Sequence, residues 1–357
     1  MSLARLLAHA ADRMAVARAT DRPVIGYVGA DVPVELLTAA GALPLRLFGA
    51  PGADHSLGDR YLGQGLDPAA RSVLSRLLLG EFGELAGVVV SRDCEASARL
   101  FYALRELRRV EPSIALPPVH LVDVLHLPHR TTTRYVLAKI RQLRATLEAW
   151  FGHAVSGHEL ARAIAAHDRL RELLTAMTRL RRERRLTGTQ ALAVVAATTA
   201  LPVGRACELV AALLDETLPE ADGKPVFLTG SGHDTGDVYA ALEETGLLIV
   251  GEDHDWGDLL FRRTVGAPTE PALAERYQHN GPAAPTSSIR HRARHTAKAA
   301  AECGAELLVL YARVRDDGPP WDFSAQREET GLPAIVLERQ PYGAADLGAL
   351  VPAGAGR

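Results

Sequence analysis

The sequence predicts an α/β protein in which two parallel-sheet domains are joined by a helical segment. Short runs of β-branched and other apolar residues alternate with helical patterns before about residue 130 and again after about residue 220. The stretch between them has helical patterns and no convincing strand. Strands that alternate with helices form βαβ units, so both ends of the chain should carry mainly parallel sheets. We expect an N-terminal α/β domain with a leading helix at 1–130, a helical segment at 131–220 and a C-terminal α/β domain at 221–357.

The first region should contain strands and helices in alternation. Its leading segment, residues 1–18, has apolar residues at helical spacing. Glycine follows two of the next helices, at Gly41 and Gly80, as is usual at a helix C-terminus. The strands are expected at 23–29, 42–48, 85–90 and 118–122, and the helices at 34–40, 68–79 and 95–109.

The helical segment and the last region follow the same reasoning. Ser156 and Glu159 form a capping-box pattern at a helix start. The arginine-rich run at 179–185 is expected to be a solvated helix end, and contact with phosphate is its alternative. Helices are expected at 133–151, 157–185, 187–199, 203–217, 237–245, 289–303 and 323–330, and strands at 225–229, 247–250, 306–311 and 334–337.

Composition excludes several classes of protein. The chain of 357 residues carries 40 Lys and Arg against 43 Asp and Glu, a net charge of −3, which argues against a surface devoted to nucleic acid. Three scattered cysteines without a CxxC pair rule out a disulfide scaffold or a local zinc finger. No apolar run approaches the roughly 18–20 residues that span a bilayer. We therefore expect a cytoplasmic protein with neither nucleic acid nor membrane as a partner.

Polar residues directly after predicted strands are the first candidates for a site, because parallel sheets bind ligands there. Cys94 follows the strand that ends at Val90, where helix N–H groups would favour a thiolate. A small buried side chain is the alternative, but polar neighbours favour a function. Cys207 and Cys303 lie in helical patterns and are expected to be ordinary buried residues.

Two further loops follow strands in the last region. Residues 251–257 hold three carboxylates, His254 and a tryptophan, which suits metal binding or acid–base chemistry as well as it suits a loop that caps the next helix. The loop 230–236, with Gly230, Ser231 and Gly232, is placed to cradle a phosphate. Its spacing matches no established phosphate-binding motif, so a plain turn is favoured.

A basic helix at 289–303 is the fourth candidate. It could attract an anionic cofactor such as a CoA nucleotide, although a solvated helix face is favoured. Its basic residues are Arg290, His291, Arg292, Arg294, His295 and Lys298.

A series of short motifs runs along nearly the whole chain. It opens at 25–46 with IGYVGADVPVELLTAAGALPLR and continues through GEFGELAGVVV and DCEASARL, which end at Leu100. It returns as VFLTGS, EDHDWG, ALAERY and ETGLPAI, the last of which ends at Ile335. In this order the motifs resemble component D of the 2-hydroxyacyl-CoA dehydratases, a lyase family that also includes benzoyl-CoA reductase subunits. The resemblance implies two flavodoxin-like (Rossmann-like) domains with a cleft between them.

The resemblance also implies a cofactor and partners. Members of this family hold a four-iron–four-sulfur cluster through three cysteines in each subunit. They work as pairs of related subunits, and a separate ATP-dependent activator supplies single electrons for chemistry on an acyl-CoA. A related subunit in a heterodimer, or a second copy in a homodimer, is the partner that this implies.

This sequence departs from the family at two of the three ligand positions. Cys94 stands at one of them, whereas Asp67 and Asp255 stand where the other two cysteines are expected. Carboxylates are hard ligands, and iron–sulfur clusters are ordinarily held by thiolates. An ordinary cluster would therefore be bound poorly.

Three hypotheses follow from this departure. The chain is a divergent subunit without a cluster that scaffolds a cluster-bearing partner, and the loss of two thiolate positions favours this. Alternatively, Asp67, Cys94 and Asp255 hold a cluster or a single metal ion, with His254 nearby. In the third hypothesis, Cys94 or the acidic loop with His254 acts catalytically on a CoA thioester without a cluster. We expect Asp67, Cys94 and Asp255 to converge on the cleft, because each lies just beyond a predicted strand or at a helix start.

Overall fold

The N-terminal half of the chain is built on a parallel sheet of four strands in the order β2-β1-β3-β4. A computed structural model describes residues 1–283 and 286–350. The strands are β1 (Val24–Val28), β2 (Leu43–Arg46), β3 (Gly87–Ser91) and β4 (Val119–Val122). The connecting helices are α3 (Val34–Ala39), α4 (Ser56–Leu62), α5 (Pro68–Leu78) and α6 (Glu95–Val110). Two short helices precede the sheet, α1 (Ser2–Ala11) and α2 (Ala15–Ala19).

The second sheet also has four parallel strands, in the order β6-β5-β7-β8. They are β5 (Lys224–Gly230), β6 (Leu247–Glu252), β7 (Leu307–Arg313) and β8 (Ala334–Gln340). The elements around them are α11 (Asp237–Glu243), η1 (Asp258–Leu260), α12 (Glu270–Gln278), α13 (Ile289–Cys303), α14 (Gly318–Thr330) and η3 (Leu347–Leu350). The predicted α/β class with two parallel sheets is therefore confirmed.

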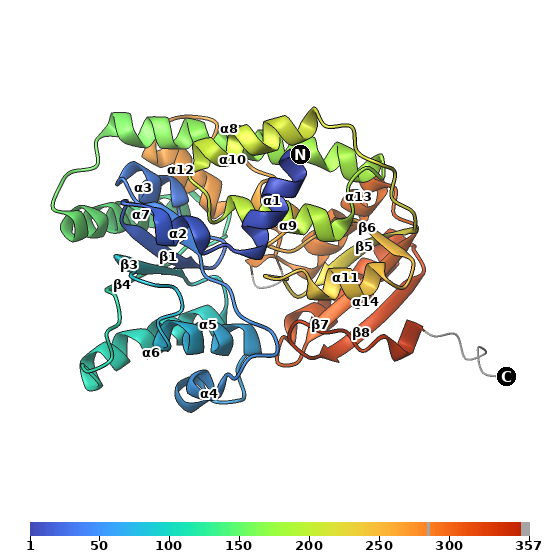
Figure 1. The fold of residues 1–357 in the computed structure, drawn as a ribbon, viewed down its shortest axis with the longest axis horizontal. Coiled ribbons are helices and arrows are strands. Elements are labelled where there is room, and N and C mark those ends of the chain that lie inside the picture. Colours follow the sequence, from blue (N-terminus) through green and yellow to red (C-terminus); the bar gives the residue numbers. More distant parts are fainter. Residues whose placement is uncertain (284–285, 351–357) are drawn as a thin grey trace.

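Four helices connect the sheets: α7 (Arg130–Phe151), α8 (Gly157–Arg182), α9 (Gly188–Thr198) and α10 (Val203–Leu214). Figure 1 shows the two sheets side by side, with α8 running along the top of the molecule. The first and second sheets are drawn in blue-green and in yellow to red, respectively. None of the helices within the described residues is long and apolar enough to cross a membrane.

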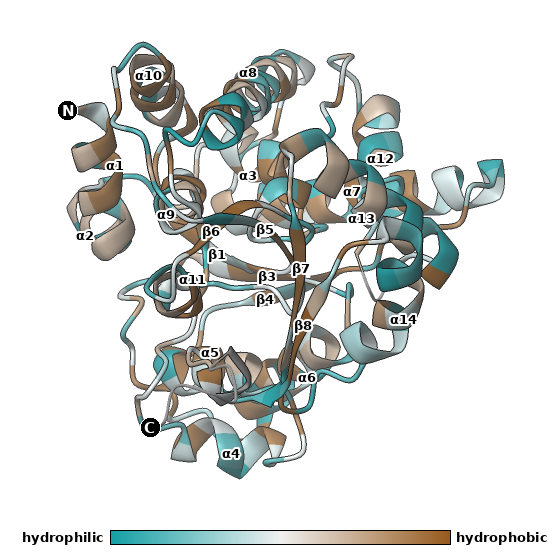
Figure 2. Cartoon of the chain, turned by 90° about the vertical axis from the view of Figure 1, so that its right-hand side faces the viewer, coloured by the Kyte–Doolittle hydropathy of each residue, from teal (hydrophilic) through white to brown (hydrophobic). Residues whose placement is uncertain are grey.

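Both faces of each sheet are buried, which explains why the strands read as continuous apolar runs. Ile25 and Val89 pack towards α7, whereas Val88 and Val90 pack in the core that includes α5 and α6. In the second sheet, Val226, Leu228 and Val309 share a core with α11, and their alternating neighbours pack with α13 and α14. Figure 2 shows β7 in brown at the centre, among helices with teal segments.

Most predicted elements are present with ends shifted by a few residues, and the differences at α12 and α14 have local causes. Helices α4 and α12 were not predicted. Helix α12 has Pro271 in its first turn and Thr269 as its N-cap, whose side chain accepts from the Ala272 amide. Helix α14 begins five residues before the predicted 323, since prolines are tolerated in a first helical turn, where the missing N–H has no helical partner.

Candidate functional site

A cavity of about 230 Å³ lies where the carboxyl ends of strands from both sheets face one another. Its wall includes Val28 and Arg46 at the ends of strands in the first sheet, and Gly230 and Arg313 at the ends of strands in the second. This is the position at which parallel α/β sheets bind ligands. Six of the residues singled out in the sequence line it, namely Asp67, Cys94, Gly230, Gly232, His254 and Asp255, and Ser231 is buried between the two glycines.

Asp67 is held by an arginine from the opposite sheet. It is the N-cap of α5, where its carboxylate accepts a hydrogen bond from the Ala69 amide at 2.9 Å. Arg313, at the end of β7, donates to the two carboxylate oxygens from Nη2 at 2.8 Å and from Nε at 3.2 Å. This two-point geometry is the strongest that arginine and a carboxylate form. Burial opposes the charge of Arg313, but Asp67 raises the pKa of the guanidinium above its ordinary value.

Asp255, which follows β6 of the second sheet, is paired with an arginine from the first sheet. Arg46, at the end of β2, forms an ion pair with the Asp255 carboxylate and donates to its backbone carbonyl at 2.8 Å. The Arg46 guanidinium lies 3.8 Å from the centre of the Trp256 ring, close enough for a cation–π contact. Each of the two aspartates is thus neutralised by an arginine that the other sheet supplies. We call these two ion pairs, Asp67–Arg313 and Asp255–Arg46, the arginine clasp.

Cys94 is the N-cap of α6, and its sulfur accepts from the Ser97 amide at 3.4 Å. Burial, together with the neighbouring Asp93 carboxyl, raises the pKa of the Cys94 thiol to about 12. In the metal-free protein the loss of hydration outweighs the hydrogen bonds from the helix and opposes the thiolate, so a functional role of Cys94 stays a prediction.

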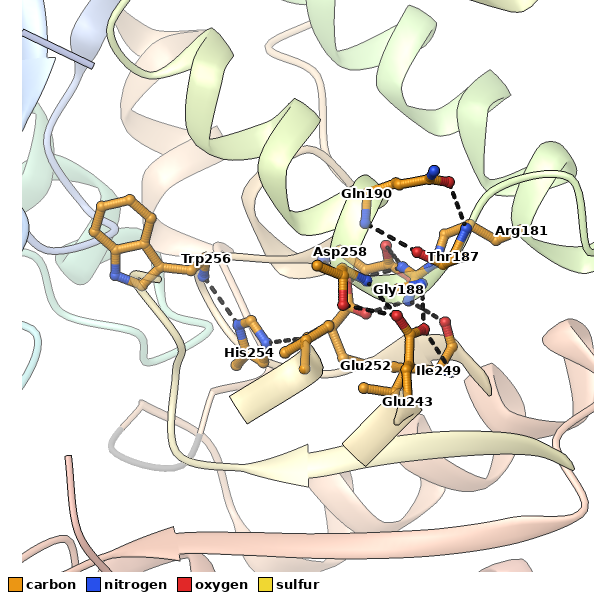
Figure 3. A network of polar contacts seen from close by, with 12 residues as sticks. Arg181, Thr187, Gly188, Gln190, Glu243, Ile249, Glu252, His254, Trp256 and Asp258 are labelled. Carbon is orange, nitrogen blue, oxygen red and sulfur yellow. Dashed lines mark hydrogen bonds and ion pairs between the residues drawn. The ribbon is translucent and has the colours of Figure 1, made fainter. Parts of the chain in front are cut away.

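His254 has both ring nitrogens engaged within the protein. The Trp256 amide donates to Nδ1 at 3.2 Å (Figure 3). Nε2 lies 2.7 Å from the Tyr239 hydroxyl. Burial lowers the pKa of His254. A neutral ring that accepts at Nδ1 and donates from Nε2 satisfies both contacts. His254 lines the cavity with both ring nitrogens engaged, and the catalytic role expected for it stays a prediction.

The rest of the acidic loop anchors it to α8. Arg181 is 1% exposed and bonds to Glu252 at 2.9 Å and to Asp258 at 3.2 Å (Figure 3). Although burial opposes ionisation, Arg181 lowers the pKa of Glu252 to about 2. Burial and the charge of Glu252 raise the pKa of Asp258 to about 7. Arg181 is therefore part of a buried structural network, and the expectation that the whole 179–185 run is solvated was wrong at this residue.

The glycine loop after β5 is joined to the end of β7. A Cβ on Gly230, whose φ is +124°, would stand 2.0 Å from the Tyr311 carbonyl oxygen. The Ser231 hydroxyl donates to Asp316 at 2.6 Å, and Arg313 donates to the Gly232 carbonyl. Glycine at Gly230 is required for close backbone approach, which agrees with the plain turn that the sequence favours over a phosphate cradle.

Several residues of the cavity escaped the sequence analysis. Asp31 follows β1 and lies 2.8 Å from His126 Nε2, and it accepts from Asn280 at 2.9 Å. Burial opposes the charge of His126, but Asp31 raises its pKa. The strand-end rule that selected Cys94 would also have selected Asp31. No local signal marks Arg46 and Arg313 as partners of the two aspartates.

Comparison of the sequence with those of known proteins places this chain in a family. The sequence model for the family described as 2-hydroxyglutaryl-CoA dehydratase, D-component, matches residues 30–338. The chain belongs to this family. It is 22% identical over 330 residues to the (R)-phenyllactyl-CoA dehydratase beta subunit of Clostridium sporogenes, covering 89% of this chain and 87% of that protein. It is 21% identical over 335 residues to the lactoyl-CoA dehydratase subunit beta of Anaerotignum propionicum, with the same coverage.

The resemblance seen in the sequence is confirmed, and the chain is a 2-hydroxyacyl-CoA dehydratase-like subunit. Its residues do not fit the iron–sulfur cluster that this family implies. Within residues 1–283 and 286–350, no three His, Cys, Asp or Glu side chains are grouped so that they could hold a metal ion. Asp67 and Asp255 are occupied by the arginine clasp, which leaves Cys94 as the single thiol among these three residues. An ordinary cluster is held by several thiolates, and Cys94 is the one cysteine among the described residues that line this cavity.

Proposed function

We propose that this chain is the cluster-free subunit of a 2-hydroxyacyl-CoA dehydratase-like complex, in which a related subunit carries the cluster. The complex would act on an acyl-CoA by reductive dehydration or reduction, with an ATP-dependent activator as its source of electrons. Support comes from the two relatives, which are named as beta subunits of dehydratases for phenyllactyl-CoA and lactoyl-CoA.

One observation carries the cluster-free role. Arginines occupy the carboxylates of Asp67 and Asp255, the two residues that the sequence predicts to stand at family cysteine positions. Arg46 is 1% exposed and Arg313 is also largely buried, so their charges need the aspartates as partners. Two buried cations already balanced in this way leave no place for a cluster with its own thiolates. The chain would then contribute its shape and its cavity to the complex, while the redox centre belongs to its partner.

Anaerobic reconstitution tests the cluster-free role directly. The purified chain is incubated with ferrous iron, sulfide and a thiol reductant, and bound iron and acid-labile sulfide are then measured. We expect no stoichiometric cluster and no visible absorption from one, whereas a three-cysteine paralogue treated in parallel should be loaded. A stoichiometric cluster that disappears in Cys94→Ala would contradict the proposal.

The complex is tested by mixing this chain with a three-cysteine paralogue. We expect the two to elute together in size-exclusion chromatography under anaerobic conditions. Turnover of a 2-hydroxyacyl-CoA should then require both subunits, the activator, ATP and a reductant. Full turnover by the paralogue without this chain would overturn the partner role.

A further inference from the structure

A second cavity, of about 70 Å³, adjoins the turn after β1, and we call it the small cavity. Gly29 and Ala30 of this turn line both cavities, so the turn separates the small cavity from the one between the sheets. Its other walls come mainly from α3, α8, the end of α9, η1 and α12. One water molecule needs about 10–15 Å³ of such space, so the small cavity suits a ligand of roughly five to seven non-hydrogen atoms.

Part of the wall of the small cavity is apolar. The side chains of this part belong to one hydrophobic cluster, and they are Leu170, Leu174, Leu201, Val203, Leu260 and Phe261. Water molecules or an inorganic ion gain nothing from contact with such a surface, whereas an aliphatic chain is stabilised there. The wall therefore favours a ligand with an apolar part.

Arg276 of α12 lines the small cavity and is only 3% exposed. Its Nε and Nη2 donate to the backbone carbonyls of Arg263 at 3.3 Å and of Leu260 at 3.2 Å. Its Nη1 is buried and has no hydrogen-bond partner within the described residues. The ring of Tyr277 lies 4.3 Å from the guanidinium, which attracts the charge but does not neutralise it. A guanidinium is always charged, so its burial without a carboxylate partner costs free energy.

The nearest carboxylates are engaged by other donors. Glu35 forms an ion pair with Arg171, and it accepts a hydrogen bond from the Tyr277 hydroxyl at 2.9 Å. Asp168 accepts from Arg171 at 2.9 Å and from the Val265 amide at 2.8 Å. Neither carboxylate is hydrogen-bonded to the guanidinium of α12.

The remaining titratable neighbours do not supply a counter-charge either. Asp31 lies 2.8 Å from His126 Nε2 and is taken up by that pair. Burial lowers the pKa of His167, which also lines the small cavity, to about 4, so this ring is neutral at neutral pH. Burial and the nearby Arg171 lower the pKa of Arg276, as expected for a cation that lacks a close partner.

We propose that the small cavity binds a short aliphatic monocarboxylate of about four carbons, such as butyrate, whose carboxylate pairs with Arg276. The carboxylate supplies the missing counter-charge and an acceptor for Nη1, while the chain lies against the apolar cluster. A second charge on the ligand would face leucine side chains, which disfavours dicarboxylates and phosphates. The proposal does not depend on the proposed function, because the small cavity is separate from the cavity between the sheets.

Calorimetric titration of the full chain with butyrate, butyramide and chloride tests the proposal. One test variant is Arg276→Met, which removes the charge. The other is Val203→Phe, which places a larger side chain at a half-buried position of the apolar wall. The matched control is Arg13→Met, since Arg13 is also buried with Nε and Nη1 unpartnered within the described residues, but it lines neither cavity.

We expect the wild-type chain to bind butyrate at least about tenfold more tightly than butyramide or chloride, because only butyrate offers both the charge and the chain. Each test variant should weaken the binding of butyrate at least about tenfold, and the control should bind it as the wild type does. Circular dichroism and the urea midpoint of each variant show whether it is folded.

Four results would overturn the proposal. The first is no heat of binding from butyrate at up to about 10 mM. The others are equal binding of butyramide, unchanged binding of butyrate to Val203→Phe, and an equal loss of affinity in Arg13→Met. Chloride that binds as tightly as butyrate would overturn the assignment to a carboxylate. If Arg276→Met does not fold, Val203→Phe and the comparison of butyrate with butyramide decide the outcome.

Discussion

Arg46 shows at the level of single residues how this site differs from a metal site. Its side chain is 1% exposed, and its charge is balanced by Asp255 on one side and the face of Trp256 on the other. A guanidinium is never deprotonated in a protein, so it requires a permanent partner when it is buried. The aspartate cannot serve a metal ion without leaving that arginine unpaired.

The thiol of Cys94 gives a prediction at the same scale. In a Cys207→Ala/Cys303→Ala background, Cys94 is the sole thiol, and its alkylation by iodoacetamide can be followed by mass spectrometry. With its pKa at about 12, we expect the rate to stay far below that of a free cysteine at pH 8 and still to be rising at pH 10. A rate that levels off below pH 8 would show a thiolate and contradict this.

The start of helix α8 shows that local sequence can fix the residue at which a helix begins. The Ser156 hydroxyl accepts from the Glu159 amide at 3.2 Å, and the Glu159 carboxylate accepts from the Ser156 amide at 2.7 Å. The capping box predicted from the spacing of these residues is therefore confirmed. It can be read from the sequence because all of its atoms lie within one helical turn.

Removal of this cap should destabilise the protein modestly. For Ser156→Ala we expect a loss of about 1 kcal/mol in the free energy of unfolding, measured by urea denaturation. Ser2→Ala offers a comparison, since α1 begins without a side-chain cap. An unchanged midpoint for Ser156→Ala would show that packing of α8 alone fixes its start.

Asp258, in the loop after β6, gives a prediction of how the stability of the protein depends on pH. The pKa of Asp258 rises from 3.8 to about 7, so the folded state keeps this proton where the unfolded chain has lost it. This contribution to stability is complete below pH 4 and is lost as the pH rises to about 7. Asp258→Asn cannot titrate. Relative to the wild type, it should therefore gain stability between pH 4 and 7 in urea denaturation. A constant difference across this range would argue against the shift.

At the scale of the whole molecule, the arginine clasp joins the two sheets across the cavity. Arg46 and Asp255 are separated by 209 residues, and Arg313 and Asp67 by 246. Each pair joins an arginine at the end of a strand of one sheet to an aspartate in a segment next to the other sheet, so both pairs depend on the relative position of the sheets. Asp67, Cys94 and Asp255, the three ligand positions predicted from the sequence, line this cavity, and the two ion pairs engage both aspartates.

Breaking the clasp should therefore cost more than breaking an ordinary surface pair. For Asp255→Asn we expect a loss of about 2–3 kcal/mol in the free energy of unfolding, because Arg46 stays buried without its counter-charge. Glu95→Gln is the control, since Glu95 and Arg99 are exposed and their pair should contribute under about 1 kcal/mol. An equal loss in the free energy of unfolding for the two variants would show that the arginine clasp stabilises the protein no more than an exposed ion pair does.

The sequence by itself determined the alternation of strands and helices, the two parallel sheets and the strand ends at which a site forms. It did so because apolar runs, caps and glycine stops act over a few residues. The domain boundaries at 130 and 220 stay predictions. The assignment of Asp67, Cys94 and Asp255 to family ligand positions also stays a prediction, although all three line one cavity.

Only the tertiary structure decided what those residues do. The pairing with Arg46 and Arg313 joins parts of the chain more than 200 residues apart, and no local pattern encodes it. The protonated state of Cys94 and the engaged ring of His254 depend on burial, which arises when the sheets close on one another. Charge balance in a buried space is a property of the assembled fold. The same three residues could otherwise have been interpreted as a metal site.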